Sequence, residues 1–222
     1  SGRGHTPEVV YESAALIRAY GFTLGIQLMI GLPGDSMQSC IFSAEETVKM
    51  QPRIARLYPT VVIRETELYE QYLRGEYKLL SEEEAVDRTK AMYEILDRAG
   101  INIIRVGLKA SDIMSAETGF HPAFRQLVEG RIARDSLESQ LEQILHNYQD
   151  KAPQNDAKMN AKMQKSILFE ANDKCYNNIF GHRGCNRAYF SERYPDVSMV
   201  YRKNPNLRNN EYRARVLRPE EE

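Results

Sequence analysis

The strongest constraint in this sequence is an ordered alternation of amphipathic segments and apolar runs across the first half. Apolar runs at residues 22–30, 54–64 and 101–108 each follow a segment with helical spacing. Nearly continuous apolar runs are typical of parallel strands buried on both faces. The order helix, strand, helix, strand, helix, strand predicts right-handed βαβ units and a parallel sheet. Three strands cannot close a barrel, so we expect the later part of a partial TIM-type (βα) barrel in an α/β fold.

Helix starts are marked by residues that can accept hydrogen bonds from free backbone amides. Thr6-Pro7-Glu8 predicts one start, Asp35 or Ser36 a second, and the capping box Ser81-Glu82-Glu83-Glu84 a third. A short helix through residues 68–72 is expected to end at Gly75. These signals fix the helical segments between the expected strands.

The pattern changes after residue 121. One helix is expected to begin at His121-Pro122, and residues 136–148 form a clear amphipathic helix. Residues 150–157 have the composition of a linker. We therefore predict two domains, residues 1–150 with the partial barrel and its trailing helices, and residues 157–222 as a smaller module.

Composition narrows the class of protein. Apolar residues make up 42% and charged residues 27%, which is typical of a folded chain. No run approaches the roughly 18 apolar residues of a membrane helix, and three cysteines predict a reducing, cytoplasmic setting rather than a disulfide scaffold. The chain begins at Ser1 without a signal segment, so we expect a processed or cloned fragment.

The net charge of −1 hides an asymmetry. Residues 1–150 carry 16 Lys and Arg against 22 Asp and Glu, whereas residues 151–222 carry 14 against 9. A basic module behind an acidic body predicts an anionic partner. An uneven but merely solvated surface is the alternative.

The basic module has the element order of a small α+β fold. Strands are expected at 165–172, 197–203 and 212–217, with Asp173 capping a short helix and a second helix after Gly184. The turn Gly181-His182-Arg183-Gly184 between two short helices resembles that of a minimal KH fold, in which glycines let a nucleic-acid backbone approach. His182 and Arg183 would then contact phosphates. The alternative is a helix-turn-helix packed on the barrel.

Four motifs occur in order: R-G-H-T at 3–6, G-I-Q-L-M-I-G-L-P-G at 25–34, L-Y-P-T-V-V-I-R at 57–64 and G-F-H-P-A-F-R-Q-L-V-E at 119–129. Together they resemble radical S-adenosylmethionine (SAM) proteins related to elongator protein 3, especially shorter bacterial members without the acetyltransferase domain. Such proteins hold a four-iron four-sulfur cluster on a CxxxCxxC segment. Cys40, Cys175 and Cys185 lack that spacing, so the resemblance covers the later portion of such an enzyme and places the cluster ligands outside this chain.

The resemblance implies a SAM site at the carboxyl ends of the strands. Arg3 would pair with the cofactor carboxylate, since a guanidinium binds a carboxylate bidentately, and Gln27 would bond the ribose. An apolar wall for the adenine would be formed by Met29, Ile30, Gly31 and Leu32, with Tyr58 nearby, and Arg64 would meet substrate or cofactor. The alternatives are a helix-capping arginine, a core glutamine, plain core packing, and an ion pair of Arg64 with Glu65 or Glu67.

The remaining histidines and cysteines are assigned structural roles. His5 and His121 are expected to form structural hydrogen bonds, with His121 fixing a helix start. Cys175, His182 and Cys185 match no common zinc pattern, so we predict no metal site within the chain and expect the two cysteines to pack in the core.

The intact protein is accordingly predicted to be a radical SAM enzyme that modifies tRNA at a uridine base. We expect it to need a reductant such as flavodoxin or ferredoxin and to have no membrane partner. This chain alone is expected to be inactive. Catalytic residues are not assigned. One alternative is a coproporphyrinogen-oxidase-like enzyme acting on a small molecule. The other is a non-catalytic RNA-binding protein.

Overall fold

The computed structural model describes residues 4, 6–109, 118–149 and 165–218. Contacts divide the chain into two units, Ser1–Val128 and Glu129–Glu222. The border falls inside a helix rather than in the expected linker, residues 150–157, which lie outside the described residues. The two-domain assignment of the sequence analysis therefore stays a prediction.

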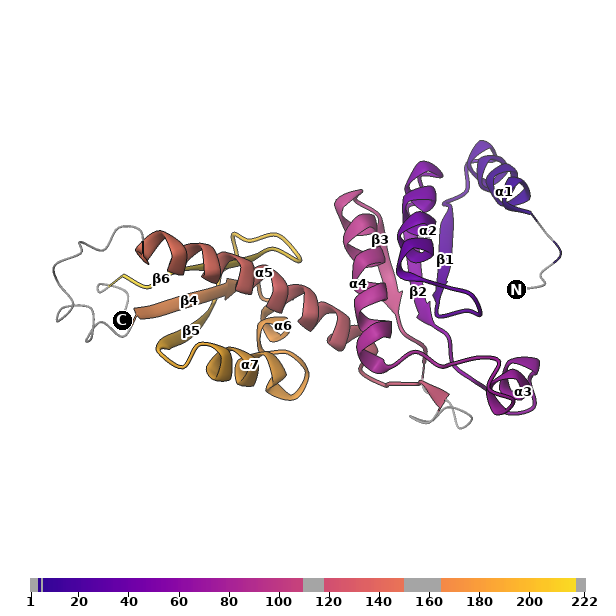
Figure 1. The fold of residues 1–222 in the computed structure, drawn as a ribbon. Coiled ribbons are helices and arrows are strands. Elements are labelled where there is room, and N and C mark those ends of the chain that lie inside the picture. The colour runs from indigo at the N-terminus through magenta and orange to yellow at the C-terminus, as the bar shows by residue number, and fades with distance from the viewer. Residues whose placement is uncertain (1–3, 5, 110–117, 150–164, 219–222) are drawn as a thin grey trace. The chain divides into compact units, whose positions relative to one another are not determined.

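The first unit is a parallel sheet with helices packed on one face. Its elements are α1 (Pro7–Ala19), β1 (Gly25–Ile30), α2 (Met37–Lys49), β2 (Ile54–Pro59), α3 (Glu67–Leu73), α4 (Glu82–Arg98) and β3 (Asn102–Val106). The strands lie in the order β1-β2-β3 and both pairs are parallel. Figure 1 shows α2 and α4 side by side along this sheet. The predicted α/β alternation and parallel sheet are confirmed.

Side-chain alternation gives this sheet a buried and an open face. Ala55 and Leu57 of β2 are fully buried with Ile30 of β1, whereas Arg56 between them is exposed. A register shift between Ala55 and Arg56 marks a bulge against β3. Residues three apart in a regular strand point to opposite faces. The extra residue of the bulge puts Ile103 and Val106 on the same, buried face of β3.

Helix starts follow the expected caps with one difference. Ser81 and Glu84 form the predicted capping box of α4, and Ser36 forms another with Ser39 at α2. Thr6 precedes α1 as expected, but its side chain does not cap the helix amides. The predicted strand 54–64 ends at Pro59, because Pro59 is the last residue paired to β1.

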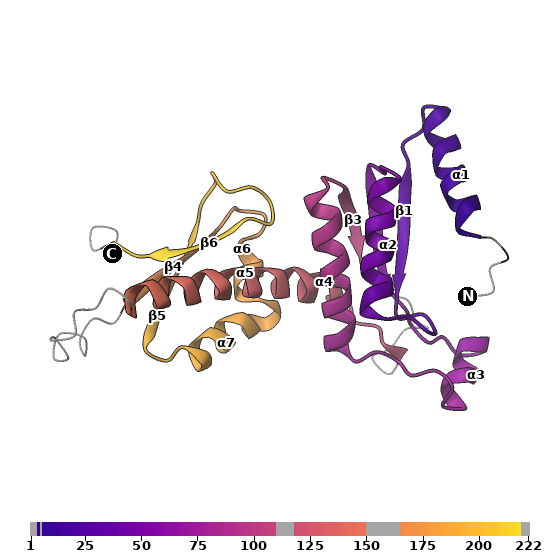
Figure 2. The same ribbon diagram turned by 45° about the horizontal axis from the view of Figure 1, so that its top comes forward.

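The second unit contains a mixed sheet in the order β5-β4-β6. It comprises most of α5 (Phe124–Gln149), then β4 (Lys165–Ala171), α6 (Tyr176–Phe180), a 3₁₀ turn η2 (His182–Gly184), α7 (Cys185–Arg193), β5 (Val197–Lys203) and β6 (Tyr212–Val216). β4 pairs parallel with β5 and antiparallel with β6. The element order is the predicted one (Figure 2).

Strand β4 is the centre of this unit. Ile167, Leu168 and Phe169 are all fully buried, and the Phe169 ring packs edge-on against Phe190 of α7 with centroids 4.9 Å apart. Helix α5 covers the edge of β6 with one amide, because Gln140 donates to the Tyr212 carbonyl and accepts from the Ala214 amide, both at 2.9 Å. These two backbone groups of the edge strand β6 are therefore not available for pairing with another strand.

Two helical expectations were wrong. The two helices expected at 121–129 and 136–148 are one continuous helix, α5. Asp173 does not cap α6, whose N-cap is Cys175 without a side-chain cap bond; the Asn172 side chain accepts from the Cys175 amide at 3.0 Å in the turn before the helix. Within the described part of the chain, no helix is long and apolar enough to cross a membrane.

Candidate functional site

The open face of the first sheet carries a polar row across all three strands. Gln27 of β1 pairs with Arg56 of β2, and Arg56 pairs with Arg105 of β3. All three are exposed, so Gln27 is not the core amide kept as the alternative. One step further along the strands, Met29 pairs with Tyr58, and both are half-buried. The structure thus brings Gln27, Met29 and Tyr58 onto one surface.

The connection after β1 is a tight loop held by one carboxylate. Asp35 accepts from the Gly31 amide at 2.8 Å and from the Ser36 amide at 2.9 Å. The Ser39 hydroxyl and the Cys40 thiol also donate to it. Gly31 has a φ of +84°, and a Cβ there would lie 2.8 Å from Leu80 Cδ1. Glycine is therefore favoured at Gly31 by the positive φ, and a larger residue would also displace the Leu80 side chain.

The charge of Asp35 is stabilised by these donors. Burial alone would raise the pKa of Asp35, but the hydrogen bonds from Ser39, Gly31, Cys40 and Ser36 outweigh it and hold the pKa below its ordinary value. Burial, together with the neighbouring Asp35 carboxylate, raises the pKa of Cys40 to about 12. Cys40 is accordingly a protonated thiol at neutral pH.

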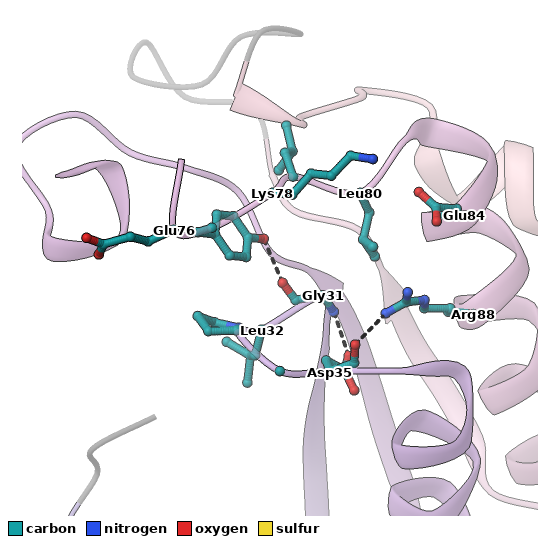
Figure 3. Close-up of a pocket in the computed structure, with 12 residues that line it drawn as sticks. Gly31, Leu32, Asp35, Glu76, Lys78, Leu80, Glu84 and Arg88 are labelled. Carbon is teal, nitrogen blue, oxygen red and sulfur yellow. Dashed lines mark hydrogen bonds between the residues drawn. The ribbon is translucent and has the colours of Figure 1, made fainter. Parts of the chain in front are cut away.

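A pocket of about 270 Å³ opens beside this loop (Figure 3). The Tyr77 hydroxyl donates to the Gly31 carbonyl at 2.6 Å, and the Arg88 guanidinium donates to the Asp35 carbonyl at 3.1 Å. Glu76, Lys78 and Glu84 complete the charged part of the lining. These two bonds join the loop after β1 to α4 and to the segment that precedes it. The pocket therefore lies at the carboxyl edge of the sheet, where α/β proteins bind ligands.

The other predicted site residues are separated. Ile30 is fully buried and Leu32 lines the pocket beside the loop. Arg64 is exposed in the turn before α3, and Glu67 bonds Arg74 at 3.3 Å. Arg3 lies outside the described residues, as does His5. The cofactor assignments of these residues stay predictions.

The turn at Gly181–Gly184 is locked from one side. Gly181 has a φ of +72°, and a Cβ there would lie 2.6 Å from Cys185 Sγ and 2.8 Å from Asn186 Cγ. Asn186, 2% exposed, donates to the Gly130 carbonyl at 2.8 Å and to the Asn178 carbonyl at 3.0 Å. The first glycine therefore serves packing within the unit, whereas nothing lies within 4 Å of a Cβ at Gly184.

The exposed half of this turn carries the predicted phosphate-binding residues. Arg183 is exposed with a φ of +52°, and His182 is half-buried. A non-glycine residue with positive φ is uncommon and often marks a functional turn. Phosphate binding by these two residues stays a prediction.

Histidine and cysteine positions are partly as expected. His121 Nδ1 accepts from the Ala123 amide at 3.1 Å, which confirms its structural role before α5. Cys175 is buried but Cys185 is exposed, so the expectation of two core cysteines was wrong. Among the described residues, no cluster of three or more His, Cys, Asp or Glu side chains has the arrangement of a metal site.

Sequence reasoning missed two groups of residues at this site. Arg56 and Arg105 occur in strands, and their alternation with buried neighbours was the available signal for an exposed position. Tyr77 and Arg88 had no signal, because their partners Gly31 and Asp35 lie more than 40 positions away in sequence.

Comparison with known proteins gives a family match over part of the chain. Residues 52–134 match the family model described as the Radical_SAM C-terminal domain. The matched region begins before β2 and extends into α5, so it includes part of the pocket lining and the His121 turn. Over this region the chain is similar to radical SAM proteins.

Individual proteins similar to this chain are tRNA uridine(34) acetyltransferases and Elongator complex protein 3. The chain is 38% identical over 88 residues to a tRNA uridine(34) acetyltransferase of Methanocaldococcus jannaschii, covering 38% of this chain and 16% of the relative. It is 36% identical over 90 residues to Elongator complex protein 3 of Homo sapiens, covering 39% of this chain and 16% of that protein. The resemblance to elongator protein 3 is confirmed.

A solved structure of the archaeal Methanocaldococcus infernus Elp3 with an N-terminus deletion is 28% identical, with a TM-score of 0.43, and covers 53% of this chain and 27% of that chain. The chain thus spans about a sixth of the length of these curated relatives.

Proposed function

We propose that this chain is the later portion of a radical SAM enzyme that modifies a uridine base of tRNA in the cytoplasm. The supporting observation is the open face of the parallel sheet. It presents Gln27, Met29 and Tyr58 together, next to the loop at Gly31–Asp35. An exposed amide beside an apolar and an aromatic side chain suits a nucleoside, which needs hydrogen bonds at the ribose and apolar contact at the base.

The described residues do not fit an iron–sulfur cluster. Cys40 is a protonated, buried thiol, Cys175 is buried, and no metal-binding cluster occurs among the described residues. We therefore place the cluster ligands outside this chain and derive no step through the cluster. When bound, cluster and SAM supply a radical to the substrate. The residues of this chain hold the nucleoside, shape the carboxyl edge and bind RNA.

The parallel sheet is the later part of a partial TIM-type barrel in this proposal, and the second unit is a KH-like module that binds the RNA. Support for the module comes from its basic composition and from the exposed turn of His182 and Arg183 between two helices. The names of the relatives support tRNA over a small molecule such as a porphyrinogen. A flavodoxin or ferredoxin would reduce the intact enzyme.

The test is the nucleoside content of tRNA. We expect deletion of the gene that encodes this chain to remove one modified uridine from total tRNA, measured by mass spectrometry of digested nucleosides. Re-expression of the gene should restore it, and the Gln27→Ala variant should restore less than a Lys49→Ala control, which changes an exposed side chain on α2. An unchanged nucleoside profile after deletion would contradict tRNA modification and favour the small-molecule alternative.

A further inference from the structure

Two arginines lie side by side on the open face of the first sheet. Arg56 of β2 and Arg105 of β3 are partners in the register of the two parallel strands, and both side chains are exposed. They are the only charged residues within β1, β2 and β3, which contain no Asp or Glu. Helices α2 and α4 pack along the opposite face of this sheet (Figure 1). The open face therefore carries positive charge alone.

The chain itself does not neutralise this pair. Within the described part of the chain, neither guanidinium has a hydrogen-bond or ion-pair partner. Adjacent strands lie about 4.8 Å apart, so like charges at partner positions repel each other. Acidic residues outnumber basic ones over residues 1–150, 22 against 16, yet none of these acids occurs in the three strands. Two unneutralised guanidinium groups at partner positions indicate a site for an anion that pairs with both.

A cavity of about 220 Å³ lies beside the pair, over β1 and β2. Its lining includes Gln27 and Arg56, which supply polar groups, and Ile54, which supplies an apolar wall. A Cβ at Gly25 would lie 2.8 Å from Ile54 Cγ1, so a larger residue there would displace this wall. The volume is below the roughly 300–1,000 Å³ of pockets for drug-sized ligands, so the cavity suits an anionic group with a few attached atoms.

We infer that Arg56 and Arg105, together with the Gln27 amide, bind the phosphomonoester group of a small molecule. A phosphomonoester carries a charge of about −1.5 to −2 at pH 7 and three strong acceptor oxygens, so it can neutralise both arginines at once. A carboxylate or a phosphodiester carries one charge and leaves one arginine unneutralised. A nucleic-acid backbone consists of phosphodiesters, and the surfaces that bind it contact several phosphates, whereas these strands supply two cations.

The inference goes beyond the proposed function, because it rests on the strand register, the charges and the cavity and on no property of tRNA. The test is an NMR titration of the full chain with methyl phosphate, and with dimethyl phosphate as the diester probe. Backbone amides of the three strands report on this face, and those of Gly181–Gly184 report separately on the basic turn. We expect methyl phosphate to shift the amides around Gln27, Arg56 and Arg105 and to bind at least tenfold more tightly than dimethyl phosphate.

Two variants assign the binding to the arginine pair. Arg56→Gln and Arg105→Gln each remove one charge and keep a polar side chain, so each should weaken methyl phosphate binding at least tenfold, about 1.4 kcal/mol. Arg98→Gln is the matched control, because Arg98 is an exposed arginine in the last turn of α4, and it should bind as the wild type does. In phosphate-free buffer, the Tm of Arg56→Gln and Arg105→Gln should not fall below that of the wild type, since one of two like charges is removed.

Four results would each overturn the inference. These are no shift of the strand amides with methyl phosphate, equal affinities for the two probes, unchanged binding by both glutamine variants, or a lower Tm for both. Equal affinities would favour an RNA backbone as the ligand, and a lower Tm would mean that the arginines already have stabilising partners in the chain.

Failure of this inference is distinguishable from failure of the proposed function. If deletion of the gene removes a modified uridine but methyl phosphate does not bind this face, tRNA modification holds without a phosphomonoester site. If methyl phosphate binding depends on Arg56 and Arg105 but deletion leaves tRNA unchanged, the site belongs to a protein of another function.

Discussion

The carboxylate of Asp35 is the group whose removal should most disturb the loop after β1. Its two oxygens collect four donors, from Gly31, Ser36, Ser39 and Cys40. In the Asp35→Asn variant an amide nitrogen replaces one oxygen. Whichever way the amide is turned, one backbone amide, that of Gly31 or that of Ser36, then faces a donor instead of an acceptor.

The magnitude follows from the bonds lost. A hydrogen bond to a charged group contributes about 1.5–3 kcal/mol. Asp35 is half-buried, so water replaces part of the loss. We therefore expect the free energy of unfolding to fall by about 1.5–2 kcal/mol, and the Tm of the first unit by about 3–8 °C. The loop should also shift in the pocket that it shares with Tyr77 and Arg88.

The stabilisation by Asp35 should decrease as the pH falls. The pKa of Asp35 is lower in the folded chain than its ordinary value of 3.8. The stabilisation is then fully present above the unfolded pKa and is lost as the pH falls through the folded pKa. The difference in stability between wild type and Asp35→Asn should be constant near pH 7 and shrink below about pH 4.

Thermal unfolding followed by circular dichroism at pH 7 and pH 3 measures both effects. Glu45→Gln is the matched control, because Glu45 is an exposed acid on α2 and the same acid-to-amide change removes one charge there. A loss in Asp35→Asn no larger than in Glu45→Gln at pH 7 would refute the argument that Asp35 holds the loop.

Three further predictions concern the rest of the chain. Asn186→Ala removes two buried side-chain hydrogen bonds, to the Gly130 and Asn178 carbonyls, so it should lower the free energy of unfolding of the second unit by about 1–3 kcal/mol in urea titrations. Replacing His182 and Arg183 by Asp should weaken tRNA binding at least tenfold, about 1.4 kcal/mol, and flatten its salt dependence in fluorescence anisotropy, whereas equal affinities would remove the turn from the RNA surface. Anaerobic reconstitution of this chain alone with iron and sulfide should yield no 5′-deoxyadenosine, and cluster-dependent turnover would contradict that.

Local signals in the sequence predicted the elements well, for physical reasons. The capping box at Ser81 and Glu84 acts within one helical turn, and the alternation of apolar runs with helices requires only neighbouring residues. Strand order in the first sheet follows the chain, so the βαβ pattern also predicted the parallel pairing.

Errors arose where a distant residue decides the local structure. Gly130 favours a helix end, yet α5 continues through it. A Cβ at Gly130 would lie 3.3 Å from Gly181 Cα, so the glycine is retained for close packing against a segment about 50 positions later. That contact cannot be seen in the sequence, so two helices were expected where one continuous helix, α5, forms. Cys185 was expected in the core, but it is the first residue of α7 and is exposed.

The difference between local signals and contacts with distant residues also explains which part of the site could be predicted. Gln27, Met29 and Tyr58 were found because alternation along a strand places them on one face, and the structure adds that the face is open. Tyr77 and Arg88 were not found, because each bonds a residue of the loop after β1 that lies far away in the sequence. At Asp35 the four donors are all supplied by the chain itself, so we expect a substitution that removes one acceptor to lower stability.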